Sequence, residues 1–429
     1  MHFENTLAFA DALDSKDPLS DFRSRFIIPK AEGKEKIYFL GNSLGLQPKS
    51  TSEYVRQIMD DWGRYGVESF FEAPEPWMDY HDSLTETLSE VMGCLPQELT
   101  VMNNLTVNLH LMLVSFYRPQ GKRFKILCEA KAFPSDQYML ETHVKHHGFD
   151  PQEAIVEVKP REGEQTLRTE DILQQIIAHR EELALVLLGG IHYYSGQVLD
   201  MHTITRMAQQ AGAKVGFDLA HAAGNIELRL HDWNLDFACW CSYKYLNSGP
   251  GAVAGAYIHE RYHADTQIQR FAGWWGYDKA TRFKMEQGFK PMLSAEGWQL
   301  GTPPLMLYAC HRAALDEIKA AGWDRIQEKR KLLTKYLWFV LDEVNKLQTS
   351  PLLSCITPRD ENEHGTQVSM NMLRDGKEVY RKLTDGGFYV DWREPSVIRL
   401  APVPLYNTFA EVWQFGQALK SILQASTNP

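Results

Sequence analysis

The sequence predicts an α/β fold in which a large domain with a mostly parallel sheet precedes a smaller α+β domain. Two observations carry this prediction. In the middle of the chain, short apolar runs rich in β-branched residues alternate with stretches of helical pattern, which is typical of parallel strands joined by helical crossovers. The C-terminal part instead places two long helical stretches before three strand-like runs and a closing helix.

The strand-like runs in the middle of the chain are apolar along their length, as expected of strands that are covered on both faces. They are Phe124–Cys128, Ala154–Val158, Leu183–Leu188, Lys214–Phe217, Asp236–Cys241 and Ala252–Ile258. Helical patterns separate the first four runs, at Pro134–His147, Thr169–Glu181 and Asp200–Ala211. The second and third helices each begin with a typical capping residue, Thr169 and Asp200.

The C-terminal region follows a different pattern. After two helical stretches within residues 305–346, the predicted elements are strands at Thr366–Met372, Tyr389–Trp392 and Val397–Leu400 and a helix at Phe409–Ala425. We therefore expect three parts: residues 1–65, an N-terminal segment that packs with the small domain; residues 66–305, the large α/β domain; and residues 306–429, the small α+β domain.

Composition and charge exclude several classes of protein. The chain has 429 residues, 44% of them hydrophobic, so it can bury a large core. Its net charge of −10 argues against nucleic acid or an anionic membrane as a partner. No run reaches the ~18 apolar residues of a membrane span, and we expect no secretory signal. Six cysteines in so long a chain do not indicate a disulfide framework, so we expect a cytoplasmic enzyme.

Two polar residues follow apolar strands at positions where open α/β sheets bind ligands. Asp218 comes directly after Lys214–Phe217, and Lys244 follows Asp236–Cys241. A buried carboxylate needs a partner, so Asp218 caps a helix, forms an ion pair, or binds a protonated ring nitrogen or a metal. Lys244 is either an exposed loop lysine or an amine whose pKa is lowered by burial, which would make it a nucleophile or base.

Two segments that open predicted helices provide groups for a phosphate. These are Asn103–Asn108 and Phe133–Asp136, since the free N–H groups of helix N-termini bind anions. The alternative is that Thr106 and Ser135 only cap their helices. Together with the acid and the lysine, these segments are the parts of a pyridoxal-phosphate site, in which an aromatic ring such as Phe133 lies against the cofactor.

Three other patterns are weaker. Gly249–Gly255 resembles a dinucleotide fingerprint, but it has one residue too many before its third glycine and leads into a strand. His259 and His263 have H-E-x-x-H spacing, but His259 ends a strand-like run, so we do not expect both imidazoles to face one zinc ion. Arg399, within the apolar run Val397–Leu400, needs an anion, which is either a substrate carboxylate or a structural partner.

Seven segments spread over nearly the whole chain resemble those of kynureninases. Phe217–His221 (FDLAH) and Cys239–Asn247 (CWCSYKYLN) are the most specific parts of the resemblance. The seven segments are Tyr38–Gln47, Asn104–Met112, Phe133–Asp136, Val215–Asn225, Asp236–Asn247, Gly273–Gly276 and Ile398–Tyr406. The resemblance implies a fold-type-I pyridoxal-phosphate enzyme, a homodimer with shared active sites, which cleaves kynurenine or 3-hydroxykynurenine to alanine and an anthranilate.

The resemblance also implies a role for individual residues. Lys244 would bear the cofactor, Asp218 would pair with its ring nitrogen beside His221, and Arg399 would bind the substrate carboxylate. Tyr243 would contact the phosphate and donate a proton when water adds to the γ-carbonyl. The other implied cofactor contacts are Leu105, Thr106, Phe133, Pro134, Ser135 and Asp136, with Trp274 and Thr302 reaching the cofactor from the partner subunit.

One departure bears on substrate choice, because Gly301-Thr302 stands where animal kynureninases carry a serine–asparagine pair linked to 3-hydroxykynurenine. Three rival functions remain open. A cysteine desulfurase would use Cys355 as its thiol, but such enzymes usually place a histidine, not Tyr243, before the cofactor lysine. A cofactor-binding regulator would need a DNA-binding segment, which the sequence does not show. The third is a metallohydrolase built on His259 and His263.

Overall fold

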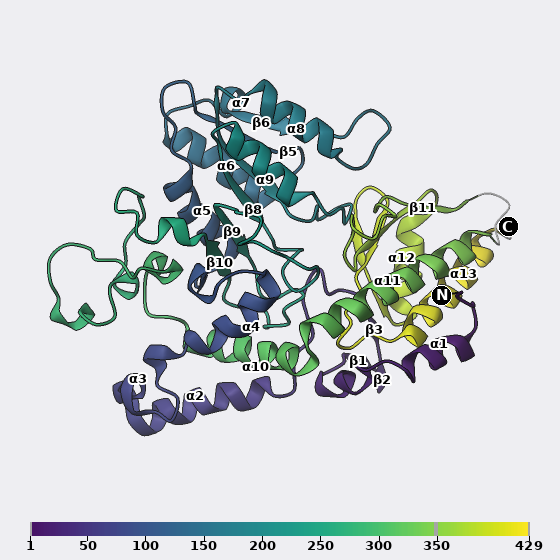
Figure 1. Ribbon diagram of the computed structural model, residues 1–429. Helices are drawn as coiled ribbons and strands as arrows, with labels where there is room; N and C mark the ends of the chain where they lie inside the picture. The colour runs from purple at the N-terminus through teal and green to yellow at the C-terminus, as the bar shows by residue number, and fades with distance from the viewer. Residues whose placement is uncertain (1, 347–350, 428–429) are drawn as a thin grey trace. The chain divides into compact units, whose positions relative to one another are not determined.

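The structure is a computed structural model that describes residues 2–346 and 351–427. The larger part of the chain is built around a seven-stranded sheet (Figure 1). Its strand order is β4-β10-β9-β8-β7-β5-β6. The strands are β4 (Leu99–Val101), β5 (Lys125–Glu129), β6 (Ile155–Val158), β7 (Leu183–Gly189), β8 (Lys214–Asp218), β9 (Phe237–Trp240) and β10 (Gly255–Ile258).

Each of the six predicted runs overlaps one of these strands, and β5, β6, β7, β8 and β9 are parallel as expected. Two features of the sheet were not part of the prediction. β10 runs antiparallel to both of its neighbours, because it follows β9 through a loop without a crossover helix. β4, which was not predicted, is only three residues long and includes the polar Thr100, so it lacks the apolar run that marks the others.

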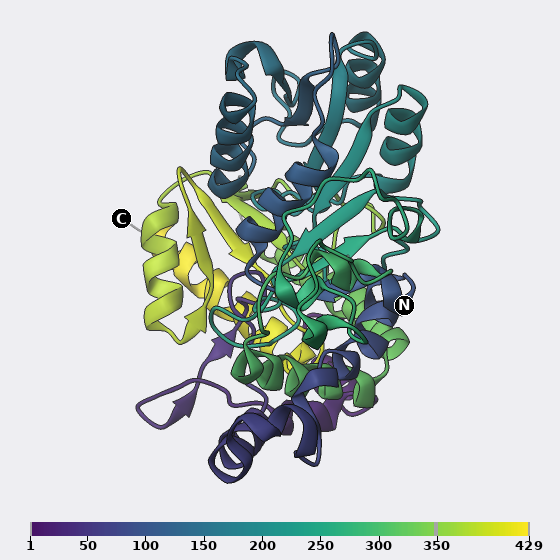
Figure 2. The ribbon, with the colours of Figure 1, turned by 90° about the vertical axis from the view of Figure 1, so that its left-hand side faces the viewer.

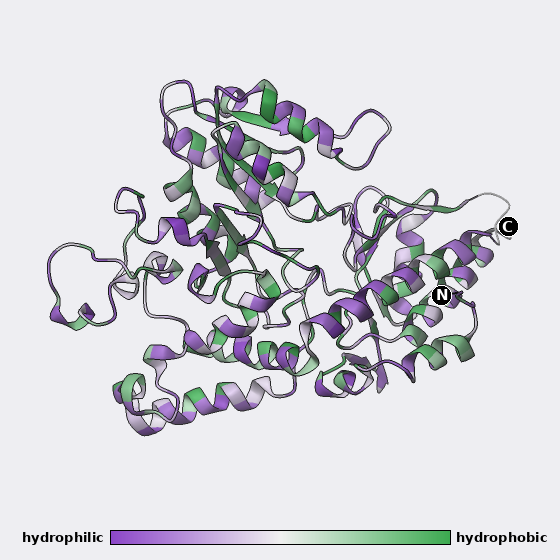
Figure 3. Cartoon of the chain, in the orientation of Figure 1, coloured by the Kyte–Doolittle hydropathy of each residue, from purple (hydrophilic) through white to green (hydrophobic). Residues whose placement is uncertain are grey.

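Helices cover both sides of this sheet (Figure 2). α5 (Leu105–Phe116) and α6 (Pro134–His146) contact each other and share a core with side chains of β5, β7 and β9. α8 (Thr169–Ala178) and α9 (Met201–Gln210) contact each other and pack on β6 and β8. Because both faces are covered, most residues of the strands are hydrophobic, as Figure 3 shows.

The predicted helix caps are partly wrong. Asp200 caps α9, since its carboxylate accepts the backbone N–H of Thr203 at 3.0 Å. Thr169 does not cap α8: it is already the first helical residue, and the capping position is held by Arg168, whose side chain makes no capping hydrogen bond. The helix also ends at Ala178 rather than Glu181, because the following residues form a turn that returns the chain to β7.

The chain forms two compact units. Unit 2 contains the sheet above and comprises residues 52–193 and 199–315, and unit 1 comprises residues 1–51, 194–198 and 316–429. The predicted boundaries lie after residues 65 and 305, whereas here α2 (Thr51–Tyr65) belongs to unit 2. Within that unit the guanidinium of Arg312, on α10 (Leu305–Ala321), lies 5.9 Å from the ring of Tyr54 on α2. The remaining helices of unit 2 are α3 (Ser69–Glu72), α4 (Asp82–Met92) and α7 (Pro151–Ala154).

Unit 1 is built on a four-stranded antiparallel sheet in the order β11-β12-β15-β14. The predicted strand Tyr389–Trp392 is two strands: β13 pairs with β3 in parallel, whereas β14 pairs with β15. Val390 lies between them and is buried, so the chain changes sheets there. The elements are α1 (Leu7–Asp14), β1 (Lys30–Ala31), β2 (Lys34–Glu35), β3 (Ile37–Tyr38), α11 (Trp323–Lys346), β11 (Leu353–Cys355), β12 (Val368–Met372), α12 (Gly376–Asp385), β13 (Phe388–Tyr389), β14 (Asp391–Arg393), β15 (Val397–Leu400) and α13 (Phe409–Thr427).

Two glycine-to-alanine substitutions test the packing of unit 2. A Cβ at Gly255 in β10 would lie 2.1 Å from Cζ2 of the buried Trp240. We therefore expect Gly255→Ala to lower the free energy of unfolding by about 1–3 kcal/mol. A Cβ at Gly63 in α2 meets no atom within 4 Å, so Gly63→Ala should instead raise it by about 0.5–1 kcal/mol. Denaturant unfolding measures both, and equal stability of the two variants would contradict this packing.

Candidate active site

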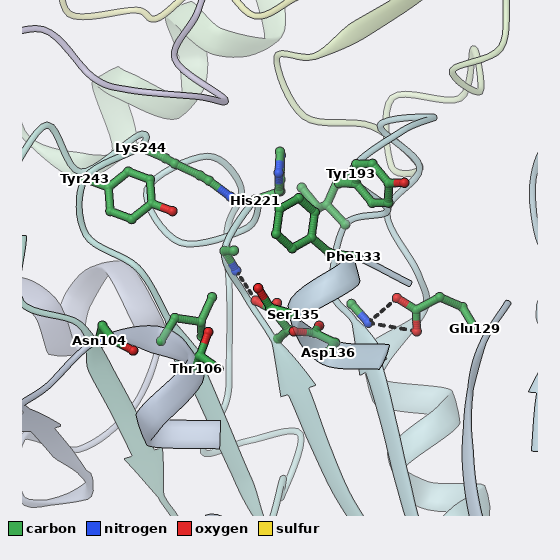
Figure 4. A pocket seen from close by; sticks show the side chains of 15 residues that line it. Asn104, Thr106, Glu129, Phe133, Ser135, Asp136, Tyr193, His221, Tyr243 and Lys244 are labelled. Atoms are coloured by element: carbon green, nitrogen blue, oxygen red, sulfur yellow. Dashed lines mark hydrogen bonds between the residues drawn. The ribbon is translucent and has the colours of Figure 1, made fainter. Parts of the chain in front are cut away.

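A pocket in unit 2 lies at the carboxyl ends of β5, β7 and β8 and beside the loop that follows β9 (Figure 4). This is the edge where open α/β sheets bind ligands. Most of the predicted cofactor-binding residues meet here. The pocket is lined by Asn104, Leu105, Thr106, Glu129, Phe133, Ser135, Asp136, Gly189, Ile191, Tyr193, Asp218, Ala220, His221, Tyr243 and Lys244.

Asp218 is the last residue of β8 and is buried. Its Oδ1 accepts the backbone N–H of Ala220 at 2.7 Å, which fixes the orientation of the carboxyl group. Burial raises the pKa of Asp218, while the hydrogen bond with Asp136 and the positive charge of Lys244 lower it. The ionised form of this carboxyl therefore depends on a cation in the pocket.

Asp136 lies in the first turn of α6 and is hydrogen-bonded to Asp218. Two carboxyl groups share a hydrogen bond only if one of them is protonated. Burial raises the pKa of Asp136 well above its usual value, and the negative charge of Asp218 raises it further. Asp136 is thus the protonated member, and it donates to Asp218.

Lys244 and Tyr243 lie in the loop after β9, and both are partly buried. The Lys244 Nζ is 6.0 Å from the centroid of the Phe133 ring and 5.8 Å from that of Tyr243. Phe133 in turn packs edge-on against Tyr193, with ring centroids 5.4 Å apart. Burial raises the pKa of Tyr243 far above its usual value, so its hydroxyl keeps its proton and can donate it.

Two helices begin at the wall of the pocket. Asn104 caps α5: its side chain accepts the N–H of Val107 at 3.0 Å, and Leu105 and Thr106 are the first helical residues. The N-cap of α6 is Phe133, followed by Pro134 and Ser135. The alternative interpretation of Thr106 and Ser135 as capping residues is therefore wrong, since both lie inside their helices. The first amides of a helix have no partner within it, and these two N-termini suit an anionic group.

The residues present fit pyridoxal phosphate. The pocket joins a primary amine, a buried acid that needs a cationic partner, an aromatic ring beside the amine, and two helix N-termini. Lys244 would hold the aldehyde carbon, Asp218 the ring nitrogen, and the starts of α5 and α6 the phosphate. This combination of groups matches the aldehyde, pyridinium and phosphate of one molecule.

Sequence reasoning missed several lining residues, of which Glu129 is the most notable. It is the last residue of β5 and is buried, and burial raises its pKa to about 7. The signal was present, since Glu129 directly follows an apolar strand, as Asp218 does. The other missed residues lie at or after the ends of β7 and β8: Gly189, Ile191, Tyr193 and Ala220.

Four predicted site residues do not line this pocket. Trp274 and Thr302 are in unit 2 and are exposed, and the Trp274 indole donates to the backbone carbonyl of Arg282 at 3.5 Å. Pro134 opens α6 next to the lining residues. Arg399 belongs to β15 in unit 1, where it is buried and ion-paired with Asp391. The structural salt bridge that the sequence left open for Arg399 is therefore present.

The dinucleotide and zinc patterns have other structural roles. The segment Gly249–Gly255 leads into β10, as predicted. The two histidines of the H-E-x-x-H spacing face different partners: His259 Nδ1 accepts the N–H of Arg261, and His263 Nε2 bonds to the carbonyl of Ile258. His259 instead lies close to Glu98 and His231. These three residues form one of two clusters, among the described residues, of histidines and carboxylates whose potential metal-ligand atoms lie close together. The other cluster is His81, Asp82 and Glu296.

The cysteines fit a packing role. Cys239 and Cys241 are buried. Cys355 ends β11 in unit 1, and burial raises its pKa to about 12. A thiol with so high a pKa is not the thiolate that a desulfurase needs as its nucleophile.

No helix among the described residues is long and apolar enough to span a membrane.

Comparison with known proteins identifies the fold and the family. Residues 326–419 match a family model described as the kynureninase C-terminal domain. In solved structures the chain is similar to the cystine C–S lyase C-DES (TM-score 0.75, 19% identity, 90% of this chain and 97% of that one). It is also similar to the cysteine desulfurase CsdA of Escherichia coli (TM-score 0.75, 15% identity, 95% and 98%). These likenesses establish the predicted α/β fold.

Full-length relatives are much more similar in sequence. The kynureninase of Flavobacterium psychrophilum is 52% identical over 98% of this chain and 99% of the relative. That of Christiangramia forsetii is 53% identical over the same shares. The animal kynureninase of Nematostella vectensis is 45% identical over 98% of this chain and 94% of the relative. Identity at this level over the whole length shows that the chain belongs to the kynureninase family.

Proposed function

We propose that the protein uses pyridoxal phosphate to hydrolyse L-kynurenine to anthranilate and L-alanine. The observation that carries this proposal is the meeting of Lys244 and Asp218 in one pocket, with Asp136 bonded to Asp218. An amine and a buried acid in this arrangement suit a cofactor that is held by its aldehyde and needs a protonated ring. The names of the full-length relatives supply the substrate.

The acids and the lysine prepare the substrate. Pyridoxal phosphate, when bound, withdraws the electron pair that remains at Cα once a bond there is broken. Asp218 holds the proton on the ring nitrogen, and the hydrogen bond donated by Asp136 orients Asp218. Lys244 Nζ would take the proton from Cα.

Tyr243 is placed for the hydrolytic step. Its hydroxyl stays protonated, because burial raises its pKa, and it can give a proton as water adds to the γ-carbonyl and recover one afterwards. The Cβ–Cγ bond then breaks. The oxygen of the water remains in the carboxylate of anthranilate, and Cβ takes up a proton to become the methyl group of alanine.

We further propose a homodimer in which Trp274 and Thr302 complete the site of the partner subunit. Both side chains are exposed and lie outside the pocket of their own chain, which is what a contribution to another copy requires. The surrounding segment also exposes large apolar side chains, and such surfaces are typical of protein interfaces. These are Phe271, Phe283, Phe289 and Leu293.

Substrate choice and cellular role are proposals of the same kind. Thr302 follows Gly301 where animal enzymes carry a serine–asparagine pair, so we propose a preference for kynurenine over its 3-hydroxy form. Arg399, buried in β15, would bind the substrate carboxylate, with Asp391 fixing its guanidinium. The reaction would serve tryptophan catabolism or NAD biosynthesis in the cytoplasm.

The proposed activity is tested with the purified protein, pyridoxal phosphate and L-kynurenine. We expect the fluorescence of anthranilate to appear with the wild type and with Cys355→Ala, and to be absent with Lys244→Ala. Cys355 is in the other unit and has a high pKa, so its loss should leave the rate unchanged. Activity that depended on Cys355 and not on Lys244 would contradict the proposed function.

Tyr243→Phe tests the hydrolytic role of the hydroxyl group. Because the ring is retained and only the proton donor is lost, we expect cofactor binding to persist and kcat to fall by ~10²-fold or more. Steady-state kinetics and the absorbance of the bound cofactor measure the two effects separately. Near-normal kcat in this variant would exclude Tyr243 as the acid.

A further inference from the structure

One carboxyl group in the pocket has no part in the proposed reaction. Glu129 ends β5 with its side chain 6% exposed, and its oxygens accept the N–H of Gly189, the last residue of β7, at 3.1 and 3.3 Å (Figure 4). The described pairing of β5 with β7 stops at Leu127 and Val186. The Glu129 side chain therefore bridges two strands beyond the point where their backbone ladder ends.

This bridge is one step away from Asp218. Gly189 pairs with Asp218 across β7 and β8, and the N–H of Gly190 donates to the Asp218 carbonyl at 2.8 Å. Gly190 is also tightly packed, since a Cβ there would lie 2.6 Å from Cδ2 of Leu219. A shift of Gly189 would thus move the strand end that carries Asp218. On its other side, Glu129 is four residues before Phe133, where α6 and its pocket residues begin.

We propose that Glu129 is a positioning residue, whose hydrogen bonds to Gly189 hold the ends of β5 and β7 at the spacing that places Asp218 for the ring nitrogen of the cofactor. This inference rests on the proposed function, because it concerns the same pocket. The role requires an acceptor at the end of a side chain of this length. An aspartate is one methylene shorter and would leave the Gly189 N–H without its acceptor, which is costly at a buried position.

The charge of Glu129 provides an independent signature. Burial raises its pKa to about 7, and the negative charge of Asp218 adds to the rise. The other titratable groups around Glu129 are Asp136 on α6, Cys128 on its own strand, and Lys244. The positive charge of Lys244 lowers the pKa of both Asp136 and Asp218. The usual glutamate pKa is 4.5, so the folded protein holds this proton more tightly than the unfolded chain does. The contribution of this tighter proton binding to the free energy of unfolding is fully present below pH 4.5 and is lost as the pH rises to about 7.

Three variants separate length from charge. In Glu129→Asp the acceptor no longer reaches Gly189, and we expect the dissociation constant of pyridoxal phosphate to rise roughly tenfold. Glu129→Gln keeps one acceptor at the same reach, so its constant should stay within about threefold of the wild type. Glu157→Gln on β6, at an exposed glutamate of the neighbouring strand, is the matched control and should change nothing. Absorbance titration of the apo-enzyme with pyridoxal phosphate gives all three constants.

The melting temperature of each holoenzyme at pH 5 and pH 8 provides the second readout. Glu129→Gln cannot ionise, so between these pH values its melting temperature should gain a few degrees relative to the wild type. Glu157→Gln should follow the wild type. If Glu129→Asp does not fold, Glu129→Ala takes its place in the titration, because it also removes the acceptor of the Gly189 N–H, and its dissociation constant should rise at least as much.

The outcomes distinguish the two proposals. A wild type that does not bind pyridoxal phosphate contradicts the proposed function. A wild type that binds it, together with a folded Glu129→Asp variant of unchanged affinity, contradicts only the positioning role. The same holds for a Glu129→Gln variant whose melting temperature follows the pH in the same way as the wild type.

Discussion

The site depends on three carboxyl groups that are buried together at one end of a sheet. Asp218, Asp136 and Glu129 line the same pocket, and burial raises the pKa of each. Acids so close together in apolar surroundings do not all ionise. The proton on Asp136 makes it a donor to Asp218, while Lys244 favours the ionised form of Asp218. A pyridinium ring suits this arrangement, because it brings the cation that a buried carboxylate requires.

The fold by itself does not select the reaction. The chain shares its fold with a cystine lyase and a cysteine desulfurase at 15–19% identity, and one fold supports many chemistries. The difference lies in side chains at the strand ends. Here a tyrosine with a strongly raised pKa precedes the lysine, and the cysteine proposed for sulfur transfer has a pKa of about 12. Both features favour a proton donor over a sulfur nucleophile, in agreement with the kynureninase relatives.

Much of this arrangement could be predicted from the sequence, because parallel strands leave strong local signals. Apolar runs located β5 to β10, and the residues that follow two of them, Asp218 and Lys244, meet in the pocket. Features that depend on distant partners were not predictable. β4 is too short to leave an apolar run. The hydrogen bond that the Gly189 N–H donates to the Glu129 carboxyl group joins residues 60 positions apart in the sequence. Arg399 illustrates the same limit. Its ion-pair partner Asp391 lies opposite it in the neighbouring strand, and only the pairing of β14 with β15 in the structure shows this.

Chemical labelling of the cofactor lysine tests the central claim most directly. Borohydride reduces the bond between a lysine and bound pyridoxal phosphate, so that the cofactor stays attached when the protein is digested and its peptides are weighed by mass spectrometry. The arrangement of the pocket predicts one labelled site, Lys244, and its loss in an Asp218→Ala variant that no longer retains the cofactor. A label on another lysine, or a reduced protein without any label, would contradict the account.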